Sequence, residues 1–217
     1  LKLHLRTYLS SRHHTEAWVK GGHLKITKLN FISEGFLDGL MNYMSLKVGL
    51  DEINYGDAHF RRTDNAEAIH NPFVGNYIMD AFTTEAFGEL TVNAYGFLAV
   101  MGVSNGKLNQ NVIVTNRYNH DNALSFYGKL GYDNRFGNDF RARLTGSWYV
   151  NYGTSTGSYL YGGDRAGARY YSVLVEEGED DVFTSGRFNP RFNQITAVQV
   201  NPFLKFRGLE FFGILEM

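Results

Sequence analysis

The sequence predicts an all-β fold, an antiparallel transmembrane β-barrel of the outer-membrane type, chiefly from two neighbouring segments. In residues 124–133 (LSFYGKLGYD) and 140–150 (FRARLTGSWYV), apolar and polar residues alternate one by one. Successive side chains of a strand point to opposite faces, so each segment predicts a strand with one apolar and one polar face. Each has about the 9–11 residues with which a tilted strand crosses a bilayer. The polar turn 134–139 between them predicts a hairpin.

Composition is the second observation. The 217 residues include 14 Tyr, 17 Phe and 24 Gly but only 3 Pro, a mixture typical of strands, tight turns and aromatic girdles. The longest apolar stretch, 95–103, is too short for a membrane-spanning helix of about 20 residues, so a membrane protein with this sequence has to be a closed barrel. The absence of cysteine excludes disulfides and thiolate metal sites, and the net charge of −1 argues against nucleic acid as a partner.

The first part of the chain predicts four strands. Alternation is clean in residues 1–10 and 44–51 and weaker in 17–28 and 32–41, with a turn at 42–43. Strand-like sequence opens the chain directly and also ends it, so we expect residues 1–217 to form a single domain that is a fragment of a longer barrel.

Two long interruptions separate the remaining strands. Residues 52–84 have no period of two and are a candidate constriction or plug loop, with a short helix expected at 72–82. Residues 151–191 are a candidate extracellular loop. The other expected elements are a strand pattern at 85–103, a tight turn at 104–106, strands at 108–115 and 169–175, and a last hairpin of 195–206 with 209–217, in which Pro202 predicts a bulge or a strand start.

The connections fall on two sides of the expected barrel of about ten strands. Turns at 42, 104, 134 and 207 lie on one side, which sends 52–84 and 151–191 to the other. Short periplasmic turns opposite longer outer loops are the rule in outer-membrane barrels.

Three segments carry a family resemblance: 45–57 (SLKVGLDEINYGD) with 60–66 (FRRTDNA), 71–85 (NPFVGNYIMDAFTTE) and 186–212. Together they resemble outer-membrane porins of the Bacteroidetes type, loosely related to the phosphate-selective porin O/P family. The resemblance implies an outer-membrane barrel with a water-filled lumen, passive diffusion of solutes and homotrimers. Members of the family are longer than this chain. The lumenal ladder of arginines and lysines of true phosphate porins has no position-by-position match in this sequence.

Six basic residues are candidates for lining the pore and setting its selectivity. Two adjacent arginines lie in the inserted loop, where a ring of charge would narrow the lumen and attract anions. The others oppose the apolar face of their strands, and a charge turned to lipid at mid-depth costs roughly 2–4 kcal/mol. A structural alternative pairs them with acids such as Asp51 or Glu210. The candidates are Arg61, Arg62, Lys129, Arg141, Arg143 and Lys205.

Other features predict no chemistry. The histidines 13, 14 and 23 are interpreted as turn residues, and the acidic run 176–181 as a solvated loop. No phosphate-binding loop, nucleophile elbow or zinc-protease motif is present, so we expect no enzyme and no cofactor.

The expected function is therefore that of an outer-membrane porin for small hydrophilic solutes, with a preference for anions such as phosphate. Its expected partners are those solutes, outer-membrane lipid and lipopolysaccharide, and further copies of the chain. The first alternative is a plugged barrel that serves as a structural or docking component of an outer-membrane assembly, since about ten strands leave little open lumen. The second is a soluble β-sandwich or lipocalin-like binder.

Overall fold

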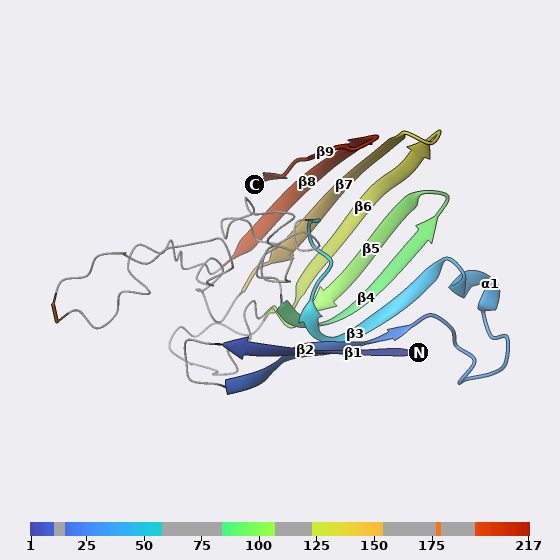
Figure 1. Cartoon of the computed structure of the whole chain (residues 1–217). Helices are drawn as coiled ribbons and strands as arrows, with labels where there is room; N and C mark the ends of the chain where they lie inside the picture. Colours follow the sequence, from blue (N-terminus) through green and yellow to red (C-terminus); the bar gives the residue numbers. More distant parts are fainter. Residues whose placement is uncertain (11–15, 58–83, 107–122, 154–176, 179–193) are drawn as a thin grey trace.

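A single antiparallel β-sheet makes up almost all of the regular structure (Figure 1). The computed structural model describes residues 1–10, 16–57, 84–106, 123–153, 177–178 and 194–217. The predicted all-β, antiparallel class is confirmed, because ten strands form one sheet and the described residues hold one four-residue helix. No helix within these ranges has the length and apolar character needed to cross a membrane.

The strands follow one another across the sheet in chain order, from β1 to β8, with β9 and β10 both pairing with β8. Each neighbour pair is antiparallel, so the sheet is a meander. The elements are β1 (Lys2–Ser10), β2 (Glu16–Ile26), α1 (Asp38–Met41), β3 (Met44–Glu52), β4 (Thr84–Ala94), β5 (Phe97–Ser104), β6 (Ser125–Phe136), β7 (Phe140–Asn151), β8 (Ile195–Phe206), β9 (Leu209–Phe212) and β10 (Leu215–Glu216).

The pattern 85–103 contains a turn that the sequence prediction missed. Tyr95 and Gly96 both have positive φ, 52° and 86°, and join β4 to β5 as a two-residue loop. Positive φ at both central residues is the requirement of the tightest hairpin turns. The prediction that the turn at 104–106 lies on the same side as the turns at 42, 134 and 207 is therefore wrong. β5 ends at Ser104, at the opposite end of the strands, where Glu52 pairs with Thr84 and Asn151 with Ile195. The long connections that begin after Glu52 and Asn151 leave the sheet at that same end.

The strand predicted at 32–41 is also wrong. This part of the chain forms turns and the short helix α1, within the connection from β2 to β3. Gly35 and Leu37 have φ of 72° and 55°, a left-handed conformation that a strand excludes. The apolar residues of 32–41 do not alternate regularly with polar ones, so one face of a strand would not be apolar.

Pro202 lies inside β8 rather than at its start. Its carbonyl oxygen accepts a hydrogen bond from the Gly213 amide at 2.9 Å, at the break between β9 and β10. The missing amide of the proline thus falls where the ladder is already interrupted. The helix predicted at 72–82 and the strands predicted at 108–115 and 169–175 lie outside the described residues.

The sheet has two unlike faces. On one, which we call the apolar face, large hydrophobic side chains are exposed over many strands, for example Val48, Met101, Leu130, Leu144 and Leu204. The opposite, covered face holds buried aromatic, acidic, basic and amide side chains together with residues 53–57, which pack against it. The alternation read from the sequence of β6 and β7 is the alternation observed.

One close contact on the covered face yields a first prediction. A Cβ added to Gly102 would lie 2.0 Å from the Tyr127 ring, whereas one added to Gly146, on the apolar face, meets nothing within 4 Å. We expect Gly102→Ala to lower the free energy of unfolding by about 1–3 kcal/mol through overpacking, and Gly146→Ala to leave it unchanged within about 0.5 kcal/mol. Denaturant titration of both variants measures the difference, and equal stabilities would contradict the packing described.

Candidate functional site

Residues 53–57, which follow the end of β3, turn back and cross the covered face of the sheet. The side chains of Ile53 and Tyr55 are fully buried there, in a cluster with Tyr127 and Tyr149. The rings of Tyr55 and Tyr149 meet edge to face with centroids 6.4 Å apart. The first part of the predicted constriction loop therefore lies against the interior of the sheet.

Side chains of several strands hold the polar groups of this segment. The amide of Asn54 donates to Glu89 Oε2 at 3.1 Å, and the amide of Gly56 donates to Ser147 Oγ at 3.1 Å. The Tyr55 hydroxyl donates to Glu216 Oε1 at 3.0 Å. Because a backbone amide buried without a partner is costly, these contacts explain how irregular backbone can cross the face.

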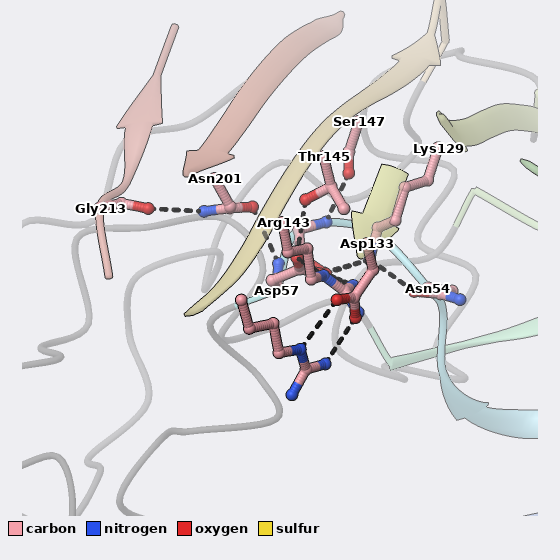
Figure 2. Close-up of polar contacts among 11 residues, drawn as sticks. Asn54, Asp57, Lys129, Asp133, Arg143, Thr145, Ser147, Asn201 and Gly213 are labelled. Atoms are coloured by element: carbon pink, nitrogen blue, oxygen red, sulfur yellow. Dashed lines mark hydrogen bonds and ion pairs between the residues drawn. The ribbon is translucent and has the colours of Figure 1, made fainter. Parts of the chain in front are cut away.

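Asp57 is the anchor of the segment (Figure 2). Its carboxylate accepts hydrogen bonds from Lys129 Nζ at 3.0 Å, from the Thr145 hydroxyl at 2.6 Å, and from Arg143 Nη2 and Nε at 2.9 and 3.1 Å. Its amide donates to Asn201 Oδ1 at 3.0 Å. The arginine contact is bidentate, the strongest geometry for a guanidinium and a carboxylate. Strands β6 and β7 thus bind the carboxylate of Asp57, and β8 binds the amide of the same residue.

Lys129 of β6 completes this arrangement. Its side chain is 0% exposed, and besides Asp57 its ammonium donates to Asn54 Oδ1 at 2.6 Å and to the Gly56 carbonyl oxygen. A buried ammonium requires both a counter-charge and hydrogen-bond acceptors, and the segment supplies both.

The pKa of Asp57 reflects these contacts. Burial alone would raise it, but the charge of Lys129, the Thr145 hydroxyl and the charge of Arg143 together lower the pKa below the ordinary aspartate value. The carboxylate is therefore ionised at neutral pH, and its ion pairs persist into mildly acidic solution.

The other basic candidates continue along the covered face toward the short turns. Arg141 Nε donates to Asp133 Oδ1 at 2.8 Å, Arg143 Nη1 lies 3.8 Å from Asp133 Oδ2, and Lys205 donates to Glu210 at 2.6 Å. Side-chain exposure rises from 0% at Lys129 to 44% at Lys205. The structure thus brings Lys129, Arg141, Arg143 and Lys205 to one face, each beside an acid. Arg61 and Arg62 lie outside the described residues.

A second buried network lies near the end of the strands from which the long connections leave. The Glu85 carboxylate, 0% exposed, accepts hydrogen bonds from the hydroxyls of Ser104 and Tyr149. The Tyr149 hydroxyl is 2.6 Å from Ser125 Oγ, to which Asn151 donates at 2.7 Å. This chain of hydroxyl and amide groups crosses from β4 and β5 to β7 and fixes that part of the sheet.

Sequence reasoning missed several of these residues. Asp57 gave no signal because the stretch after β3 has no period that would place it against the sheet. Glu85 and Glu89 could have been found, since they alternate with Ala86 and Gly88 on β4. His23 is a strand residue of β2, which corrects its interpretation as a turn residue.

The arrangement can hold a fixed pattern of charge on the covered face of the sheet. Within the described ranges, no group of three or more acidic or histidine side chains is placed to hold a metal ion. No protein-family model, no curated protein and no solved structure matches the chain.

Proposed function

We propose that this sheet is part of the wall of an outer-membrane β-barrel, and that the barrel is a porin through which small hydrophilic solutes diffuse passively. The observation that carries the proposal is the contrast between the two faces of the sheet. Exposed Leu, Val, Met and aromatic side chains extend over many strands of one face, whereas charged and amide groups are gathered on the other. Apolar surface of that extent marks an interaction with lipid or with protein, and strands of about this length with alternating faces are the pattern of membrane barrels.

The charges of the covered face support a weak preference for anions. Arg141, Arg143 and Lys205 are partly exposed on that face, toward the short turns, and Asp57 and Asp133 moderate their field. Charged rings at a narrow point of a pore set its ion preference. In this proposal residues 53–57 narrow the lumen, Arg61 and Arg62 extend the basic field, and the apolar face contacts lipid, lipopolysaccharide and further copies of the chain.

Single-channel recording in planar bilayers tests the proposal. We expect discrete conductance steps and, under a salt gradient, a reversal potential that indicates anion preference. Arg61→Ala combined with Arg62→Ala should shift that potential toward cations, because it removes two positive charges from the inserted loop. Lys28→Ala, in the connection between β2 and β3, is the control for loss of a basic charge elsewhere. Absence of conductance steps argues against the porin, and an unchanged potential in the double variant argues against the role of Arg61 and Arg62 in its selectivity.

A specific observation favours a second candidate, the plugged barrel that acts as a structural or docking component. Ile53, Tyr55 and Asp57 fill part of the covered face with fully or almost fully buried side chains. A small barrel filled by side chains has no aqueous path. Protein that inserts into the bilayer but gives no conductance step would support this candidate over the porin.

A further inference from the structure

Two histidines lie side by side on neighbouring strands, outside the network of Asp57. His4 of β1 is the direct register partner of His23 of β2. Their rings stack with centroids 5.0 Å apart and planes inclined by 9°. His23 is on the covered face, because its next register partner, Gly49, pairs in turn with the buried Phe87. The pairing brings two imidazoles close enough for one ion to bind both once a ring turns out of the stack.

Asp51 of β3 orients the inner histidine. Its Oδ2 is 2.7 Å from His23 Nδ1, and the Asp51 side chain is almost fully buried. A carboxylate only accepts hydrogen bonds, so Nδ1 carries the hydrogen and the lone pair of the neutral ring is on Nε2. A carboxylate–histidine pair of this kind is the usual support of a metal-binding imidazole, which it orients and makes more basic.

The two histidines are accessible, and a glycine on the next strand leaves room for His23. The side chain of His23 is 17% exposed, and His4 is exposed. Gly49 lies beside His23 on the next strand, and a Cβ there would come within 2.6 Å of His23 Cα and 2.8 Å of its Cβ. A glycine at this position is therefore required for His23 to keep its place next to Asp51.

We propose that His4 and His23 together bind one divalent transition-metal ion. The ligands are Nε2 of His23 and a ring nitrogen of His4, Asp51 orients His23, and water completes the coordination. Imidazole suits Cu²⁺, Ni²⁺ and Zn²⁺, with metal–nitrogen distances of about 2.0–2.1 Å. Because the lone pairs lie in the planes of two nearly parallel rings, the exposed His4 ring has to turn out of the stack for both nitrogens to point at one ion. Lys25 and Lys47 pair in the adjacent row, and their positive charge weakens the binding of every cation. Cu²⁺, the ion with the highest intrinsic affinity for nitrogen ligands, is therefore the one expected to bind measurably.

Titration of the full chain in detergent micelles with Cu²⁺ tests the site. Electron paramagnetic resonance should report one bound ion with two imidazole nitrogens. His4→Gln and His23→Gln should each weaken binding at least about 10-fold, and Asp51→Asn should weaken it by about 10-fold or more because the orienting carboxylate is lost. The double variant His13→Gln with His14→Gln is the matched control and should bind like the wild type.

The outcomes decide the assignment independently of whether the barrel conducts. Unchanged binding in His4→Gln or His23→Gln, or loss of binding in the His13, His14 control alone, overturns it. If a glutamine variant fails to refold, substoichiometric Cu²⁺ is added to the wild type and histidine signals are followed by NMR. Selective broadening of the His4 and His23 signals supports the site, and broadening confined to other histidines rejects it.

Discussion

Replacing Asp57 by alanine is expected to lower the free energy of unfolding by about 3–5 kcal/mol, the range for breaking a buried ion pair from one side. The variant loses the carboxylate that neutralises Lys129, which is fully buried, and that binds Arg143 in a bidentate contact. Urea or guanidinium titration of the full chain in detergent micelles, followed by tryptophan fluorescence, measures the change. Asp139→Ala is the matched control, because Asp139 and its partner Arg207 are 55% and 69% exposed and their contact is 3.5 Å long. Exposed pairs of this kind contribute little.

A companion variant separates charge from packing. Asp57→Ala combined with Lys129→Met removes both charges and restores apolar volume, so it should cost less than the sum of the two single changes. Additive costs, or a loss for Asp57→Ala no larger than that for Asp139→Ala, would show that Asp57 is not the anchor of the segment.

The same carboxylate gives the stability a defined dependence on pH. The pKa of Asp57 in the folded chain is lowered relative to the unfolded value of about 3.9, so the ionised group stabilises the fold fully above that value. The contribution is lost as the pH falls through the lowered folded pKa. The difference in stability between wild type and Asp57→Ala should accordingly be largest near neutral pH and shrink in acid.

The second large effect concerns the apolar face. Leu130 lies in the middle of β6 and is 60% exposed. If this face contacts lipid, Leu130→Lys should destabilise the protein folded into phospholipid vesicles by about 2–4 kcal/mol, the cost of a lysine near the bilayer midplane. If the face contacts water, the change is within about 0.5 kcal/mol. Leu130→Ala, which removes apolar area without adding charge, is the matched control.

Alternation decided how much of the fold could be predicted. In β6 and β7 each residue of the pattern has the face expected of it, and Lys129, Arg141 and Arg143 lie opposite the exposed Leu130 and Leu144. Alternation is uninformative where a local conformation interrupts an apolar run. Tyr95 and Gly96 turn the chain at the start of the apolar stretch 95–103, where the sequence carries no polar turn, and the positive φ of both residues reveals it.

The candidate site was predictable only in part, because its two halves come from different kinds of sequence. The basic residues are on strands, where phase gives direction. Their acceptor, Asp57, lies beyond the end of β3, and its position depends on contacts with Thr145 and Asn201, which are 88 and 144 residues away in the chain. No periodicity within a segment encodes such contacts. The same limit applies to His4 and His23, whose contact follows from the register of β1 with β2.

The path of residues 53–57 across the covered face also sets an order of folding events. Tyr55 is hydrogen-bonded to Glu216, 161 residues later in the chain, and Asp57 is bonded to strands that are all synthesised after it. Closing loops of that length costs entropy before any contact offsets it, and topologies dominated by distant contacts fold slowly. We therefore expect residues 53–57 to reach their final position last, after the hairpin of β6 and β7 has formed and β8 has joined it.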